Sequence, residues 1–226
     1  MPAGRVLILT ATYVEAGAIA RALGLSRGAD RKSWGNVNGA GIGLHVVGVG
    51  GRRLPKVSAG PPVGWVILAG LAGGLDPGLK SGDVVMSGGP GDFRPRTAVW
   101  VGAIHTAGSI VATPADKAAL FASTGAAAVD MESAVVRPFA ETRGARLVDV
   151  RVILDTAAET LSADLARLVD PFGRARTWAV ATHLLRDPRT LGTLLKLGAS
   201  TRAVLKTLGI VVADLVEHLE GRKVSR

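Results

Sequence analysis

The stretch Ala128-Val-Asp-Met-Glu-Ser133, followed by Val150-Arg-Val-Ile-Leu-Asp155, decides the predicted fold. Each stretch has the pattern of a short apolar strand with acidic residues at its carboxyl end, and the residues between them suffice for a crossover helix. In an open α/β sheet, ligands bind just outside the carboxyl ends of the strands. We therefore expect the acids of both stretches, together with Arg151, to converge on one pocket.

The chain before these stretches alternates predicted strands and helices. Arg5–Thr10 has the pattern of a buried strand, and Tyr13–Leu23 has helical spacing and ends at Gly24. Trp65–Ala69 is a further predicted strand, which leads into a glycine-rich turn at Gly70–Gly74. The alternation favours a three-layer α/β fold, with helices on both sides of a sheet.

The later part of the chain continues the alternation. Pro114–Ser123 is a predicted helix with Thr113 as its N-cap, and Glu132–Arg143 is a second helix before the strand Arg146–Leu154. From about Glu159 the chain is predicted to be helical, with apolar residues at a period of 3.6. We therefore expect one domain with a helical C-terminal tail.

Length and composition fit this organisation. The 226 residues are 48% hydrophobic and 20% charged, which suits a single domain over 1–226 with a core at 1–158 and C-terminal helices at 159–222. The chain has no cysteine, which excludes disulfides, thiolate zinc sites and cysteine nucleophiles. The first apolar run is short, and no segment is apolar enough to span a bilayer, so we expect a cytoplasmic protein.

The formal net charge of +9 permits two kinds of partner. Nucleic acid is not expected, because aromatic residues make up only 4% of the chain and no nucleic-acid motif is present. Basic residues concentrate between Pro171 and Lys206, and such a helical segment can lie on an anionic membrane or form a solvated helix face. The first interpretation adds peripheral contact with the inner membrane to the expected cytoplasmic location.

The acidic residues at the predicted strand ends each allow a structural and a chemical interpretation. Asp130 can cap the following helix, whereas the carboxylate of Glu132 can accept hydrogen bonds from two vicinal hydroxyls, as on a ribose. Arg151 and Asp155 are four residues apart on one strand, so they form either a salt bridge or a site in which Asp155 is a general acid. Glu15 is either a favourable first-turn acid or a residue that holds a nucleophilic water.

Three motifs, taken together, resemble one family: Ala69–Val85, Val129-Asp-Met-Glu-Ser133 and Val150–Ala157. They look like the nucleoside phosphorylase/nucleosidase family, which includes the methylthioadenosine/S-adenosylhomocysteine nucleosidases. The resemblance runs in order from Arg5 to about Ala158. It implies a three-layer α/β/α sandwich around a mixed central sheet, and a homodimer.

One branch of the family is the most similar. Ala112–Leu120, Thr124–Ser133 and the basic stretch at Arg186–Leu195 resemble the hopanoid-associated phosphorylases. This branch is held to remove adenine from adenosylhopane. The resemblance therefore implies cleavage of the N-glycosidic bond of an adenosine-type, lipid-linked substrate by an N-ribosyl hydrolase or phosphorylase. A methylthioadenosine-type nucleosidase and a nucleoside-binding protein without turnover remain alternatives.

The resemblance also implies roles for individual residues. Glu132 matches the acid that binds the ribose hydroxyls, and Met131 matches the residue that packs on the sugar. Asp155 matches the acid that interacts with the purine N7 and assists its departure. Glu15 matches the acid that positions the attacking water, and Arg151 a basic residue near that water.

The resemblance further implies that Thr113 binds the substrate near the base, and that Ala72 and Gly73 bind it in the glycine-rich stretch. The chemistry requires no metal and no organic cofactor, and phosphate is the alternative co-substrate to water. The sequence departs from the family at Leu71, where the nucleosidases often have a serine at the nucleophile site. The segments at 52–64 and 85–109 are also shorter than in the family, which predicts a pocket that is more open or is completed by a second chain.

Overall fold

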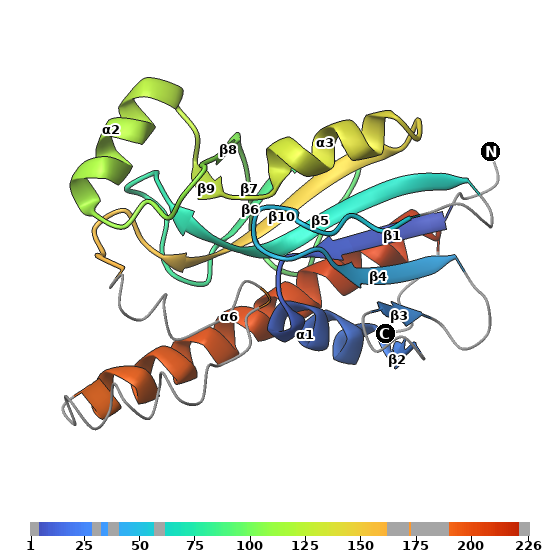
Figure 1. The fold of residues 1–226 in the computed structure, drawn as a ribbon, viewed down its shortest axis with the longest axis horizontal. Helices are drawn as coiled ribbons and strands as arrows, with labels where there is room; N and C mark the ends of the chain where they lie inside the picture. The colour runs from blue at the N-terminus through green and yellow to red at the C-terminus, as the bar shows by residue number, and fades with distance from the viewer. Residues whose placement is uncertain are drawn as a thin grey trace.

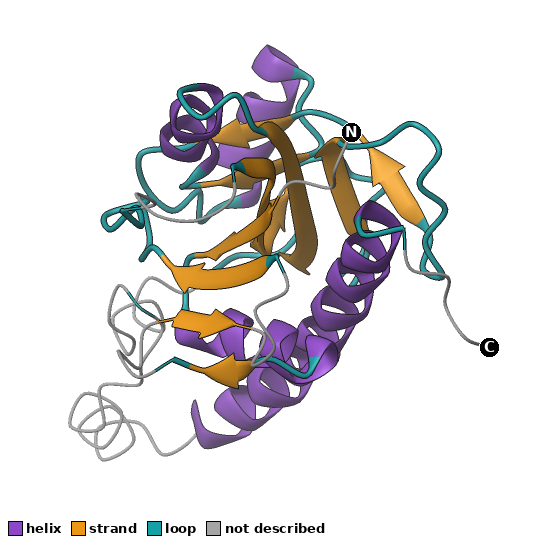
Figure 2. Cartoon of the chain, turned by 90° about the vertical axis from the view of Figure 1, so that its right-hand side faces the viewer, coloured by secondary structure: helices purple, strands orange, loops and turns teal. Residues whose placement is uncertain are grey.

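The computed structural model describes residues 5–28, 33–35, 41–56, 62–161, 172 and 190–221, and within 190–200 only the helical backbone. A mixed sheet lies between two groups of helices (Figure 1, Figure 2). One face carries α1 (Tyr13–Leu23) and α6 (Thr190–Leu219), and the other carries α2 (Pro114–Thr124) and α3 (Ser133–Glu141). The predicted three-layer α/β/α sandwich is confirmed.

The sheet contains ten strands within the described residues. In chain order they are β1 (Arg5–Thr10), β2 (Ser26–Arg27), β3 (Ser33–Gly35), β4 (Ile42–Val46), β5 (Val63–Gly74), β6 (Val84–Gly88), β7 (Val99–Val101), β8 (Ile104–Thr106), β9 (Ala128–Asp130) and β10 (Arg146–Asp155). Their spatial order is β2-β3-β4-β1-β5-β10-β6-β7, with β9 paired to β5 and β8 paired to β9.

The central strands bring the predicted strand-end residues to one edge of the sheet. β1 is parallel to β4 and β5, and β5 is parallel to β10, so the carboxyl ends of these strands meet at one edge. β9 pairs antiparallel with the last two residues of β5 and adds its own end to the same region. β6 runs antiparallel to β10, which makes the sheet mixed, as predicted.

The helix boundaries follow from local capping. The side chain of Thr12 accepts a hydrogen bond from the backbone N–H of Glu15, whose carboxylate accepts one from the N–H of Thr12 at 2.8 Å. This capping box satisfies two free N–H groups at the start of α1. α2 begins after Thr113, which caps it as predicted, and the helix ends at Gly125 in the left-handed conformation.

Two apolar layers form the core, one on each face of the sheet. The face toward α1 and α6 includes Leu208, Val212 and Leu215, which are fully buried. The opposite face includes Val136 and Phe139 of α3. The apolar stripe of α6 from Val204 to Val216 is therefore part of the core.

Most of the basic stretch between Pro171 and Lys206 lies outside the described residues, as does much of the proline-rich segment near Pro61. Among the helices that the structure describes, none combines the length and the apolar character that crossing a bilayer demands.

Two predictions of local structure are wrong. Gly70–Gly74 is not a turn, because β5 continues through it and pairs with β10 and β9. Glu159 does not begin a helix. Its carboxylate accepts a hydrogen bond from the N–H of Thr156 at 2.8 Å, and its carbonyl accepts one from Lys117, so the chain forms a turn there.

Candidate active site

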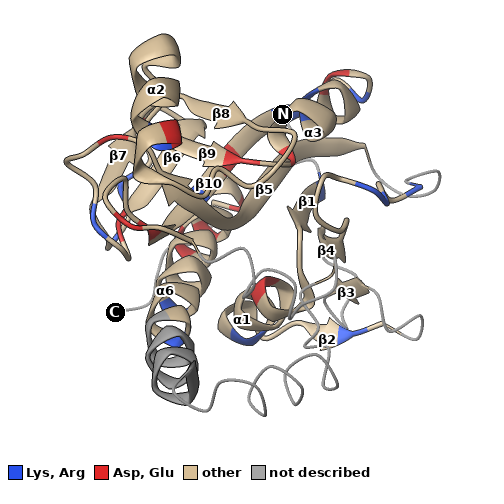
Figure 3. Cartoon of the chain, turned by 60° about the vertical axis from the view of Figure 1, so that its left-hand side comes forward, with Lys and Arg blue, Asp and Glu red and all other residues tan. Residues whose placement is uncertain are grey.

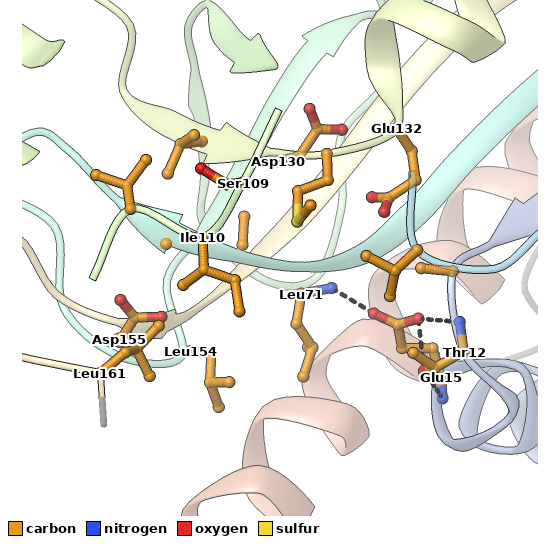
Figure 4. A pocket seen from close by; sticks show the side chains of 17 residues that line it. Thr12, Glu15, Leu71, Ser109, Ile110, Asp130, Glu132, Leu154, Asp155 and Leu161 are labelled. Atoms are coloured by element: carbon orange, nitrogen blue, oxygen red, sulfur yellow. Dashed lines mark hydrogen bonds between the residues drawn. The ribbon is translucent and has the colours of Figure 1, made fainter. Parts of the chain in front are cut away.

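A cavity of about 280 Å³ opens where β1, β5, β9 and β10 end (Figure 4). Acidic residues gather at the end of β9 and just after it, beside β5 (Figure 3). The polar lining residues are Thr12, Glu15, Ser109, Asp130, Glu132 and Asp155. The rest of the lining is mostly aliphatic and includes Val49, Leu71, Ile110, Val111, Leu154 and Leu161. The strand-end acids therefore share one pocket, as the sequence predicts.

The structure places most of the predicted site residues in this wall. Glu15, Met131, Glu132 and Asp155 line the cavity, and so do Ala72 and Gly73. Two predicted residues lie elsewhere. Arg151 is completely buried behind the wall, and Thr113 is exposed at the start of α2, where its hydroxyl accepts a hydrogen bond from the N–H of Asp116.

Glu15 is held by three donors from two elements. Its Oε2 accepts hydrogen bonds from the N–H of Thr12 at 2.8 Å and from the hydroxyl of Thr12 at 2.7 Å, and its Oε1 accepts one from the N–H of Leu71 at 2.8 Å. Each carboxylate oxygen has two acceptor positions, so Oε1 keeps one for a water in the cavity. Glu15 is therefore both the helix-capping acid and a cavity residue.

Glu132 is the N-terminal flanking residue of α3 and is 4% exposed. Its Oε1 accepts a hydrogen bond from the N–H of Gly50 at 3.0 Å, and its Oε2 lies 3.5 Å from Nη1 of Arg151. Burial raises the pKa of Glu132 above its usual range, while Arg151 and the Gly50 N–H oppose the rise. The carboxylate is thus fixed from two sides at the cavity wall.

Arg151 sits within a cluster of buried carboxylates. Its Nε donates to Asp149 at 2.8 Å, its Nη2 pairs with Asp130, and its Nη1 faces Glu132. Burial lowers the pKa of Arg151, but the surrounding carboxylates outweigh this effect and raise it. The alternative interpretation of a salt bridge between Arg151 and Asp155 is wrong, because each has other partners. Arg151 orients the acids rather than contacting the cavity itself.

Ser133 joins two acids of this cluster. Its hydroxyl is within hydrogen-bonding distance of both Asp130 and Asp149. A hydroxyl has one hydrogen, so it donates to one carboxylate, and the other contact is a hydrogen bond only if that carboxyl holds a proton. Burial raises the pKa of Asp149 above its usual range, against the opposing charge of Arg151, and this direction favours a proton on Asp149.

Asp155 forms a different ion pair. Its Oδ2 accepts a hydrogen bond from Nζ of Lys117 at 2.5 Å. Burial raises the pKa of Asp155, and the ammonium group of Lys117 limits the rise. A carboxyl with a raised pKa at a cavity wall is suited to donate a proton to a bound base.

Sequence reasoning missed four residues of the site: Gly50, Lys117, Ser133 and Asp149. Only two of them carry a signal in the sequence. Gly50 lies in a glycine run after an apolar stretch, and Asp149 is a charged residue within an otherwise apolar strand, where it needs a buried partner. Lys117 and Ser133 lie at ordinary helix positions, and nothing local marks them.

Part of the sequence matches a known family model. Residues 91–186 match the model of the phosphorylase superfamily. This match includes Asp130, Glu132, Arg151 and Asp155. A comparison with curated protein sequences found no match.

Solved structures share the fold over nearly the whole chain. An adenine complex of a 5′-methylthioadenosine/S-adenosylhomocysteine nucleosidase from Colwellia psychrerythraea has a TM-score of 0.65 and 17% identity, covering 99% of this chain and 98% of that one. The 5′-methylthioadenosine nucleosidase of Arabidopsis thaliana has a TM-score of 0.59 and 18% identity, covering 100% and 99%. The futalosine hydrolase of Helicobacter pylori has a TM-score of 0.58 and 16% identity, covering 96% and 97%. The chain thus has the fold of these nucleosidases.

Within the described residues, no group of three or more His, Cys, Asp or Glu residues is arranged to hold a metal ion. The acids of the cavity are engaged with backbone N–H groups, Arg151 and Lys117 instead.

Proposed function

We propose that the chain belongs to the nucleoside phosphorylase/nucleosidase family and cleaves the N-glycosidic bond of an adenosine-type nucleoside. The observation that carries the proposal is the set of four carboxylates, Glu15, Asp130, Glu132 and Asp155, in the wall of one cavity. Glu132 and Asp155 lie at opposite sides of the pocket view (Figure 4), which suits a nucleoside with one acid at the sugar and another at the base. The shared fold and the family match over 91–186 support the proposal.

The chemistry needs residues of this kind. Breaking the N-glycosidic bond builds positive charge on the ribose ring, and fixed carboxylates stabilise that charge. Glu132 is positioned by Gly50 and Arg151 to accept hydrogen bonds from the ribose hydroxyls. Asp155 protonates the departing adenine, a contribution worth ~10²–10⁴-fold in rate.

Water is the proposed nucleophile. The described residues that line the cavity include four acids and neither lysine nor arginine, and the guanidinium of Arg151 is engaged with acids behind the wall. A phosphate anion in this cavity would be repelled by the acids without a compensating cation. Glu15 keeps an acceptor position for a water, and the N–H of Leu71 holds Glu15 in place where the family has a serine nearby. We therefore propose a hydrolase rather than a phosphorylase.

We propose adenosylhopane as the substrate, on the strength of the sequence resemblance. The aliphatic lining supports an apolar 5′ substituent, and a cavity of about 280 Å³ is near the lower end of the range for ligand sites. It therefore holds the nucleoside portion, and a large lipid would extend outside it. Action on such a substrate would bring a cytoplasmic protein into contact with the inner membrane.

The test is release of free adenine. The protein is incubated with adenosine, methylthioadenosine and an adenosylated hopanoid, with and without phosphate, and the base and sugar products are measured. We expect adenine from the hopanoid substrate, a ribose that keeps its 5′ substituent and carries no 1-phosphate, and a rate loss of at least ~10²-fold in Asp155→Asn. If adenine comes mainly from methylthioadenosine, the proposed substrate is wrong. If the sugar product is phosphorylated, the protein is a phosphorylase and not a hydrolase. If no substrate releases a base, the proposed function is refuted.

A further inference from the structure

Lys117 is an unusual residue of α2. It is the only buried residue of this helix, and its side chain is 0% exposed. Lysine is almost never fully buried unless it is paired, because removing its charge from water is costly. The helix therefore contacts the rest of the chain through a buried ammonium group as well as through Leu120 and Phe121, which pack on an apolar cluster.

The ammonium group of Lys117 uses all three of its hydrogens. Nζ donates to Oδ2 of Asp155 at 2.5 Å, to the carbonyl of Thr156 at 2.7 Å and to the carbonyl of Glu159 at 2.8 Å. A lysine ammonium has three donors and no acceptor, so the site matches its charged form in full. The two carbonyls keep Lys117 in place whichever protonation state Asp155 has.

Asp155 stands between this ammonium group and the cavity. Its carboxyl is 9% exposed, with Oδ2 bound to Lys117, and the residue lines the cavity. The charged groups facing it among the described residues are Lys117 from α2 and Glu159 from the turn after β10. Gly73 of β5 lies beside the same carboxyl, since a Cβ there would be 3.4 Å from Oδ2, and it brings no charge.

We propose that Lys117 is a positioning residue that acts through Asp155, holding its carboxyl at the cavity wall and stabilising the carboxylate that remains after proton transfer. This rests on the proposed function. As the bond between the sugar C1′ and the base breaks, its electron pair passes to the base. The proton of Asp155 passes to the base, and water forms the new bond to C1′ while its proton passes to Glu15. The carboxylate formed at Asp155 already faces a cation.

The expected signature is a change in pH dependence. Asp155 must be protonated to donate, so kcat falls as the pH rises through its pKa in the complex. An opposite charge within a few ångströms shifts a carboxyl pKa downward by about 1–3 units. Lys117→Met should therefore move the alkaline limb of kcat to higher pH by about one unit or more, and should lower kcat about 10-fold to 10²-fold because Asp155 becomes a weaker acid.

The experiment compares four proteins on the substrate that the wild-type protein cleaves: wild type, Lys117→Met, Asp155→Asn and the double variant. Lys80→Met is the matched control, because it makes the same change at an exposed lysine. If Lys117 acts through Asp155, the double variant should have nearly the same kcat as Asp155→Asn alone. An unmoved alkaline limb in Lys117→Met, or a full multiplicative loss in the double variant, would overturn the proposal.

A measurement on the wild-type protein covers the case in which Lys117→Met does not fold. The side-chain ammonium signal of Lys117, followed by nitrogen-15 NMR, should be protected from exchange and should shift with the midpoint of the alkaline limb. A signal that does not shift over that range refutes the role of Lys117. Absence of base release by the wild-type protein refutes the proposed function instead, so the two failures are distinguishable.

Discussion

At the scale of single residues, the buried cluster around Arg151 contains more acids than its one positive charge can balance. Asp130, Glu132 and Asp149 all contact the guanidinium group. An uncompensated buried charge is costly, and a buried carboxyl avoids this cost by holding a proton. Because the hydroxyl of Ser133 is shared and the pKa of Asp149 is raised, we predict that this proton lies on Asp149.

Asp149→Asn tests this protonation state through stability. A carboxyl whose pKa is raised on folding stabilises the protein below its unfolded pKa, and this contribution is lost as the pH rises through the folded pKa. Asparagine does not ionise, so the variant does not lose stability as the pH rises from the unfolded pKa through the folded pKa of Asp149. Over this pH range its free energy of unfolding should exceed that of the wild type by a growing margin. Urea unfolding at a series of pH values measures the difference.

Asp130→Asn is the comparison variant, because it weakens the ion pair between Asp130 and Arg151. Breaking a buried pair typically costs about 3–5 kcal/mol, so we expect this variant to be less stable than the wild type near neutral pH. A similar loss in Asp149→Asn near neutral pH would show that Asp149 is ionised and that the proton lies elsewhere.

At the scale of elements, β5 is the strand that joins the two halves of the site. It pairs with β1 and β10 along its length and with β9 at its end, and Glu15 and Arg151 both approach it on the same side at Gly70. A Cβ at Gly70 would lie 2.8 Å from Nη1 of Arg151 and 2.8 Å from Oε1 of Glu15. The glycine is there because two charged groups approach the strand, and not because the chain turns.

Gly70→Ala should therefore displace Glu15 and Arg151, both of which are held by other hydrogen bonds. We expect a loss of about 10²-fold in kcat/KM, since misplacement by about 1 Å has that effect, and a destabilisation of about 1–3 kcal/mol. Gly17→Ala is the control, because a Cβ at Gly17 in α1 meets nothing within 4 Å. It should retain activity and gain about 0.5–1 kcal/mol of stability. Equal activity in both variants would contradict the close approach at Gly70.

The helix α6 shows why an apolar helix face is ambiguous when only the sequence is known. Its apolar period over 204–219 is confirmed as one face of a helix. That face packs on the sheet and on α1, where a Cβ at Gly209 would lie 3.1 Å from the carbonyl oxygen of Ala18. An apolar helix face in the sequence has the same pattern whether it meets a core or a membrane, so only the packing separates the two.

At the scale of the whole molecule, we predict a homodimer. The most exposed large apolar side chains include Trp100 and Val101 on β7, the edge strand of the main sheet, and Ile110 at the cavity. Exposed apolar side chains on an edge strand favour association with another chain. Sedimentation velocity should give twice the mass of one chain, and Val101→Lys should shift the protein toward the monomer. A monomer at all micromolar concentrations would contradict the prediction.

The sequence alone predicted what local patterns encode. The strand Arg5–Thr10, the capped helices α1 and α2, and the acids Glu132 and Asp155 at strand ends all follow from periodicity, caps and strand-end position. These features depend on residues within a few positions of one another. Their physical cause is backbone geometry and the need to bury apolar side chains.

The tertiary structure alone decided the partners of those acids. Lys117 meets Asp155 across 38 positions, Gly50 meets Glu132 across 82, and Leu71 meets Glu15 across 56. It also decided that β5 runs straight through its glycines, because β10 and β9 continue to pair with it there. Such contacts depend on how distant elements pack. The same packing removes water from the carboxyls, and in that environment the neighbouring charges influence which carboxyl holds a proton.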